Sequence, residues 1–199
     1  MGELQGFSLK IYRKMRVLKN MLIIGGASRN VGKTELVCGL VRRFGKEREI
    51  VSLKISGINP GNDPLHGTHG PVPEKFHLLR ETSLEGIKDS SKMLLAGAAM
   101  AFYLRTRDEY LQEAMDHFFL QTRPDTVIIC ESIVLRKIIT PGLFVLIRSD
   151  KEETMKRSLG EVLDLVDLTI VSDGKSFSPP PENIHLGNKG WYYNNSFTG

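Results

Sequence analysis

The stretch Ile-Gly-Gly-Ala-Ser-Arg-Asn-Val-Gly-Lys-Thr, residues 24–34, decides the fold that we expect for this chain. It joins a short apolar run, residues 21–24, to a segment with helical periodicity through a glycine-rich turn. Strand, turn and helix in this order are typical of a phosphate-binding loop, whose backbone N–H groups and helix dipole attract phosphates. Lys33 would add a mobile cation, and the Thr34 hydroxyl would bind Mg²⁺.

The residues that we expect to bind the nucleotide form one continuous run. Ala27 stands where the usual pattern has glycine, so the motif is either Ala-x4-Gly-Lys-Thr or, counted from Gly26, one residue longer. The predicted nucleotide-binding residues are Gly26, Ala27, Ser28, Arg29, Asn30, Val31, Gly32, Lys33 and Thr34.

Length, charge and cysteine content narrow the class of protein. A chain of 199 residues suffices for one α/β domain, and a net charge of +4 does not by itself favour nucleic acid as a partner. Two lone cysteines, Cys38 and Cys130, indicate buried thiols in a reducing compartment. No apolar run is long enough for a membrane span, and the first residues lack the apolar core of a signal peptide. We therefore expect a cytoplasmic protein.

Hydrophobic periodicity predicts an alternation of strands and helices over residues 21–175. Residues 1–20 would form a basic extension, and residues 176–199 a tail packed on the domain surface. Six strands are expected at 21–24, 50–55, 99–104, 126–130, 143–147 and 168–172. Helices are expected at 36–44, 73–80, 89–97, about 107–122 with Thr106 and Glu109 as a capping box, and 155–166. This order predicts a mostly parallel sheet of six or more strands.

The long segment 56–73 is rich in glycine and proline and leaves the second strand close to the predicted phosphate site. We expect it to act as a lid over the ligand, the alternative being a solvated connector. His66, His69 and His77 could in principle bind a metal. We favour no metal there, because no cysteine or carboxylate cluster with ligand spacing accompanies them.

Three residues outside the loop are candidates for chemistry. Glu131 ends an apolar strand, where an acidic residue beside a phosphate loop binds Mg²⁺ directly or through water. Asp89 follows the long insertion, and Lys54 ends the second strand. We predict Thr34, Asp89 and Glu131 as metal-binding residues, and Lys33, Lys54 and Glu131 as catalytic residues.

Two segments resemble known families of phosphate-loop proteins. Residues 26–34 resemble the loop of the dethiobiotin synthetase and cobyrinic acid synthetase group. Residues 86–98, with Lys-Asp-Ser-Ser-Lys leading to Ala-Gly-Ala, resemble molybdopterin-guanine dinucleotide biosynthesis protein B, as does the Ser172-Asp173 that closes the last strand. Lys54 and Glu131 match a lysine and a glutamate that both families carry. The resemblance implies a three-layer α/β/α P-loop NTPase fold.

Three functions follow from the resemblance and stay open at the level of sequence. The first is an accessory protein of molybdenum-cofactor biosynthesis that binds GTP or ATP with Mg²⁺ and hydrolyses it slowly. The second is an ATP-dependent ligase of dethiobiotin synthetase type, and the third is a nucleotide-binding domain without turnover. The protein partners to consider are a cofactor-biosynthesis enzyme and a second copy of the chain.

Overall fold

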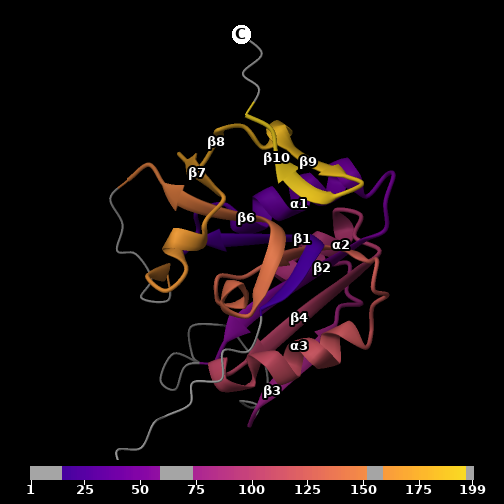
Figure 1. Ribbon diagram of the computed structural model, residues 1–199. Coiled ribbons are helices and arrows are strands. Elements are labelled where there is room, and N and C mark those ends of the chain that lie inside the picture. Colours follow the sequence, from indigo (N-terminus) through magenta and orange to yellow (C-terminus); the bar gives the residue numbers. More distant parts are fainter. Residues whose placement is uncertain (1–14, 59–73, 152–158, 196–199) are drawn as a thin grey trace, which may run out of the picture.

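The computed structural model describes residues 15–58, 74–151 and 159–195 (Figure 1). The chain is an α/β protein with a mostly parallel, eight-stranded sheet in the order β3-β4-β2-β5-β1-β6-β7-β8, in which only the edge strands β3 and β8 run antiparallel to their neighbours. The strands are β1 (Arg16–Gly26), β2 (Ile50–Gly57), β3 (Phe76–Arg80), β4 (Met100–Thr106), β5 (Val127–Glu131), β6 (Ile139–Ser149), β7 (Leu168–Ser172) and β8 (Phe177–Ser178). A separate hairpin consists of β9 (Ile184–Gly187) and β10 (Gly190–Tyr193).

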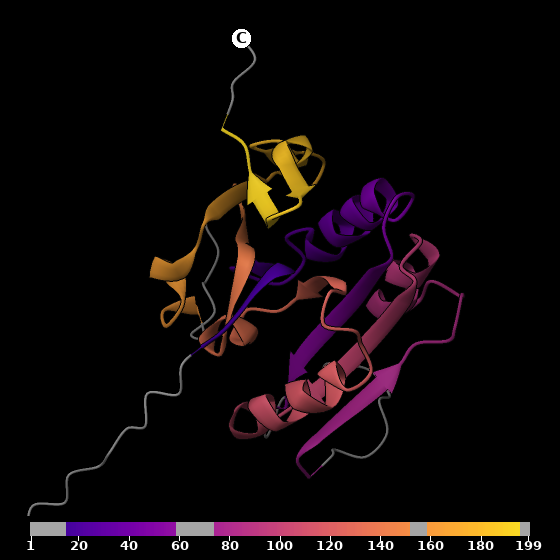
Figure 2. The ribbon, with the colours of Figure 1, turned by 45° about the vertical axis from the view of Figure 1, so that its right-hand side comes forward.

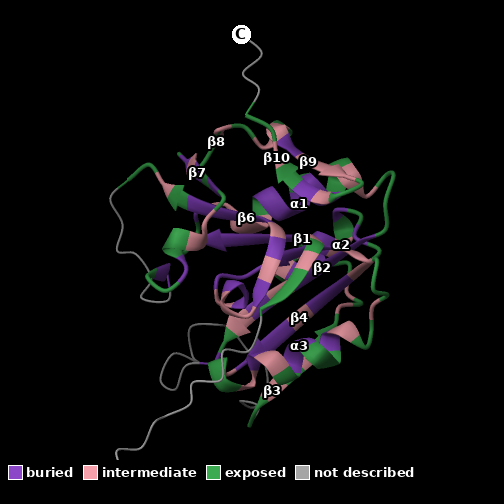
Figure 3. Ribbon diagram, viewed as in Figure 1, coloured by how far each residue is buried: buried purple, intermediate pink, exposed green. Residues whose placement is uncertain are grey.

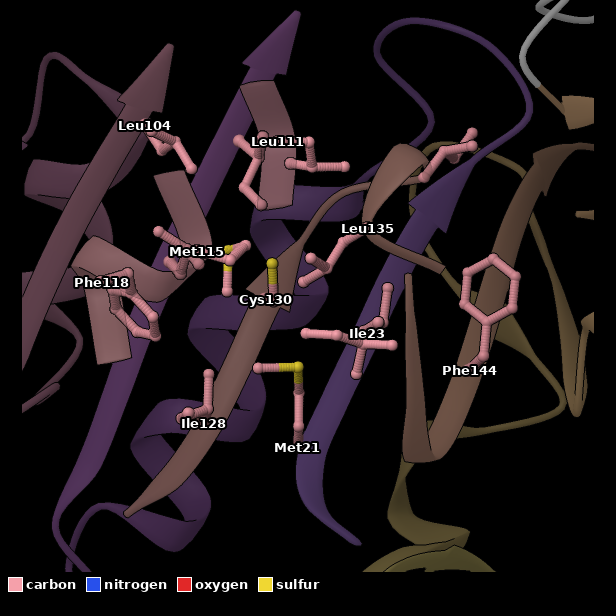
Figure 4. Close-up of a cluster of buried hydrophobic side chains, with 14 of the residues drawn as sticks. Met21, Ile23, Leu104, Leu111, Met115, Phe118, Ile128, Cys130, Leu135 and Phe144 are labelled. Atoms are coloured by element: carbon pink, nitrogen blue, oxygen red, sulfur yellow. The ribbon is translucent and has the colours of Figure 1, made fainter. Parts of the chain in front are cut away.

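Helices lie on both faces of the sheet. The α-helices in the described ranges are α1 (Lys33–Phe44), α2 (Asp89–Leu95) and α3 (Leu111–Phe119), and the 3-10 helices are η2 (Asp108–Tyr110), η3 (Val134–Lys137), η5 (Leu163–Leu165) and η6 (Pro181–Asn183). A core of buried hydrophobic side chains lies on each face of the sheet, and alternate side chains of β1 point into one or the other. Leu22 packs with α1 and α2, whereas Met21 and Ile23 pack with α3, including Met115 and Phe118 (Figure 4).

The central strands are buried on both faces, as the continuous apolar runs predict for parallel strands (Figure 3). The strands expected at 50–55, 99–104, 126–130 and 143–147 are confirmed with shifted ends, and the strand expected at 168–172 coincides with β7. The helix after the glycine-rich turn is also confirmed, and it ends at Gly45 as expected. Because β1, β2, β4 and β5 pair in parallel, their carboxyl ends lie along one edge of the sheet, which is where such sheets usually bind ligands.

The helix expected at 73–80 is wrong. Residues 76–80 form the edge strand β3, in which Phe76 and Leu78 pack against the core while His77 is exposed. Pairing with β4 stabilises this strand, and a run of five residues is too short for periodicity to distinguish it from a helix.

Two further helix predictions need correction. The capping box does not form, because the Thr106 hydroxyl donates to the carbonyl of Arg107, and a 3-10 turn precedes α3. Of the helix expected at 155–166, the described residues 159–166 form turns and the 3-10 helix η5, and residues 155–158 lie outside the described ranges.

The limits drawn at residues 20 and 176 also differ from the structure. β1 begins at Arg16, so the boundary expected after residue 20 falls inside a strand. The sequence predicts a tail on the surface, but Ile184 and Trp191 are buried in the core that contains α1. Figure 2 shows the hairpin beside α1, away from the edge strand β3. The segment 59–73 lies outside the described ranges, and with it most of the predicted lid, His66 and His69.

Candidate functional site

The glycine-rich turn connects β1 to α1 at the carboxyl edge of the sheet. Two of its residues have left-handed backbone conformations, Asn30 with φ 57° and Gly32 with φ 86°. The N–H of Ala27 donates to the carbonyl of Ile147 at 2.8 Å, which ties the start of the turn to β6. Arg29 and Asn30 are exposed, whereas the Val31 side chain is buried in the core. The turn is thus anchored at both ends and open to solvent in its middle.

The side chain of Lys33 folds back over the turn. Its Nζ donates to the carbonyl oxygen of Ser28 at 3.1 Å. A Cβ atom added to Gly26 would lie 2.6 Å from Cδ and 2.9 Å from Nζ of Lys33. Glycine is therefore required at position 26 for this lysine conformation. Counting the motif from Gly26 places its first glycine where the structure needs the space.

A cluster of charged side chains lies at the ends of β2 and β5, beside the turn. Lys54 and Glu131 are direct neighbours in the parallel pairing of these strands. The Lys54 ammonium contacts Oε1 of Glu131 and, at 2.7 Å, Oδ2 of Asp89, the first residue of α2. The Thr34 hydroxyl donates to the other oxygen of Glu131 at 2.9 Å. Strand register and the starts of two helices thus bring together four of the residues predicted from sequence.

Burial and charge act in opposite directions on this cluster. The side chains of Glu131 and Lys54 are only 3% and 17% exposed. Burial alone would lower the pKa of Lys54, but the carboxylates of Glu131 and Asp89 outweigh it, so its pKa lies above the ordinary value. Burial would raise the pKa of Asp89, but the Lys54 ammonium, its hydrogen bond to Asp89 and the Lys92 ammonium hold it below the ordinary value. Both groups are therefore charged at neutral pH.

The oxygen atoms of this cluster suit a hard divalent cation. Thr34, Asp89 and Glu131 supply a hydroxyl and two carboxylates, which are the ligand types that Mg²⁺ prefers. The hydrogen bond from Thr34 to Glu131 fixes the hydroxyl at the residue that follows Lys33. The side chains that are present therefore fit Mg²⁺, provided that the Lys54 ammonium moves away from at least one of the carboxylates.

One residue near the turn had no signal in the sequence. Phe177 of β8 lies beside the left-handed Gly32, because a Cβ atom at that glycine would be 3.0 Å from the Phe177 ring. Pairing of β7 with β8 brings this ring to the turn, and no motif in the sequence marks it.

The third histidine considered as a metal ligand, His77, lies on the exposed edge strand β3. Within the described ranges, no group of three or more His, Cys, Asp or Glu side chains is arranged to hold a metal.

Comparison with known proteins gives no relative from which a function can be transferred. The chain matches no protein-family model, and no curated protein or solved structure is significantly similar to it. None of the helices in the described ranges is long and apolar enough to cross a membrane.

Proposed function

We propose that this chain is a P-loop protein of three-layer α/β/α fold that binds GTP or ATP with Mg²⁺ and hydrolyses it slowly. The observation that carries the proposal is the arrangement of Lys33 over Gly26, next to a Thr34 hydroxyl bonded to Glu131. Lys33 would exchange the Ser28 carbonyl for phosphate oxygens, and the turn's backbone N–H groups would bind the remaining oxygens. Thr34, Asp89 and Glu131 would hold Mg²⁺, which neutralises phosphate charge when bound.

The contacts of Glu131 support slow hydrolysis. One carboxylate oxygen accepts from Lys54 and the other from Thr34, so both are engaged in orienting neighbouring groups. A carboxylate used in this way is a poor general base, because a base must reach the proton of the attacking water. The proposed role is that of an accessory protein that acts with a cofactor-biosynthesis enzyme.

The test of nucleotide binding is Lys33→Ala, with Lys46→Ala as the matched control. Lys33 lies over the turn, whereas Lys46 is exposed just beyond the end of α1. We expect calorimetry to show loss of Mg-nucleotide binding for Lys33→Ala and parental affinity for Lys46→Ala. Circular dichroism should show both variants folded. Equal affinity in Lys33→Ala and the parent would refute the proposal.

Competition between ATP and GTP decides the base. Only the family resemblance favours GTP, so measuring the relative affinities for GTP and ATP would show which nucleotide the chain prefers. Release of phosphate measured with the preferred nucleotide then distinguishes slow hydrolysis from binding without turnover.

A further inference from the structure

Burial distinguishes Lys54 from Lys137, a lysine that also contacts two carboxylates. The partners of Lys137 are Asp108 and Glu161, whose side chains are 61% and 67% exposed. The side chain of Glu131, in contrast, is only 3% exposed, and that of Lys54 only 17%.

The Lys54 ammonium contacts one oxygen from each of two carboxylates, Asp89 and Glu131, that approach from different elements. Those two oxygens, with the nearby Thr34 hydroxyl, are the atoms that would hold a divalent cation. The chain's own cation therefore stands among the oxygen atoms of the proposed metal site.

We infer that Lys54 occupies the place of the divalent cation in the nucleotide-free protein, so that Mg²⁺ enters only together with the nucleotide. The inference rests on the proposed function and assigns Lys54 the role of a positioning residue that sets the order of binding.

The charges around the cluster explain this order. The carboxylates of Glu131, which is 3% exposed, and Asp89, which is 36% exposed, repel each other, and Lys54 compensates one of the two negative charges. Mg²⁺ arriving alone would have to displace the ammonium, leaving a mostly buried positive charge without partners. Phosphates change this balance, because they offer Lys54 new anionic partners close to the carboxylates that it leaves.

The direct test is a titration with Mn²⁺ in the absence of nucleotide. The electron paramagnetic resonance signal of the free ion measures how much Mn²⁺ is bound. In Lys54→Met the charge is lost while the length of the side chain is kept. We expect this variant to bind one Mn²⁺ at least about tenfold more tightly than the parent, since a cation close to both ligands has been removed. Adding Asp89→Asn to Lys54→Met should abolish the gain, which locates the ion in the cluster.

Lys92→Met is the matched control. Its ammonium lies 3.8 Å from the other oxygen of Asp89 but is half exposed. Removal of this charge should change Mn²⁺ affinity by less than about threefold, because solvent screens an exposed pair. An unchanged or weaker Mn²⁺ affinity in folded Lys54→Met would overturn the inference, as would an equal gain in Lys92→Met.

The unmodified chain provides a test that does not depend on the folding of a variant. Without nucleotide it should bind Mn²⁺ weakly, and tight binding of one Mn²⁺ by the nucleotide-free parent would refute the role given to Lys54. Failure of the parent to bind any nucleotide would instead refute the proposed function. The nucleotide-free titrations would still decide whether Lys54 blocks the cation position.

Discussion

At Gly26, one added carbon atom should affect ligand binding more than the stability of the fold. A methyl group at this position would meet the distal part of the Lys33 side chain rather than backbone. The lysine is flexible and can move, so the fold tolerates the change, but the conformation over the turn is lost. The space at Gly26 therefore determines where the Lys33 ammonium lies, and it contributes little to the packing of the domain.

We therefore predict that Gly26→Ala lowers Mg-nucleotide affinity at least about tenfold and changes the free energy of unfolding by no more than about 1 kcal/mol. Calorimetry and urea denaturation measure the two quantities. Gly39→Ala is the control, since its added methyl meets no atom within 4 Å on the exposed side of α1. It should raise the free energy of unfolding by about 0.5–1 kcal/mol and leave affinity unchanged. The reverse pattern would contradict our account of Gly26.

The two cysteine thiols should be unreactive in the folded protein. Burial raises the pKa of Cys38 to about 11, and burial raises the pKa of Cys130 well above its ordinary value. The thiolate is the reactive form, and at pH 8 only about a thousandth of a thiol with a pKa near 11 is ionised. A disulfide reagent should label neither cysteine at pH 8 until denaturant is added. Fast labelling of the native chain would show that at least one of these thiols is accessible.

At the scale of elements, the β9–β10 hairpin joins the C-terminal part of the chain to α1 and β1. The Trp191 ring packs edge-on against Phe44 with a centroid distance of 5.0 Å, and its Nε1 donates to the carbonyl of Asn20 at 3.1 Å. Gly190 allows this approach, because a Cβ atom there would lie 2.0 Å from the Lys19 carbonyl oxygen. The hairpin is therefore a part of the core and not a surface attachment.

Trp191→Ala should lower the free energy of unfolding by about 3–5 kcal/mol, because it removes a buried aromatic ring and leaves a cavity. Tyr192→Ala is a matched control in the same strand, where the ring is 49% exposed and stacks on His185. Its effect should be below about 1.5 kcal/mol. Urea denaturation measures both changes, and equal effects would show that the hairpin is not anchored through Trp191.

The elements found correctly from sequence are those whose signal is local. The turn at 25–32 has its own glycines, and α1 has its own apolar stripe and a closing glycine. The missed elements depend on distant residues: β3 is a strand because it pairs with β4, and Trp191 is buried because β1 lies beneath it. The sequence predicted Lys54, Asp89 and Glu131 individually. Only strand register and the start of α2 show that the lysine lies between the carboxylates.

At the scale of the whole molecule, the proposed ligand would bind groups from several elements at once. Thr34 is on α1, Lys54 on β2, Asp89 on α2 and Glu131 on β5. A ligand that engages all of these positions binds the folded chain and not the unfolded one. Its binding energy therefore adds to the free energy of unfolding.

Mg-nucleotide at about 100 times its dissociation constant should raise the free energy of unfolding by about 2.7 kcal/mol. For a chain of this length the melting temperature should rise by about 5–10 °C. Differential scanning fluorimetry with GTP and ATP checks the shift, with Lys33→Ala as the control that should show none. A shift that persists in Lys33→Ala would place the ligand elsewhere on the molecule.

The position of β5 in the sheet determines when, during synthesis and folding, the candidate site can form. β5 lies between β1 and β2, although it begins about 100 residues after the end of β1 and about 70 after the end of β2. The first two strands are therefore not joined until β5 is inserted. During synthesis the glycine-rich turn leaves the ribosome long before Glu131 does. A nascent chain that has reached only β4 has the lysine of the turn without the carboxylate that orients Thr34. If the chain binds nucleotide as proposed, binding would mark the completed sheet and not the β1–α1 unit alone.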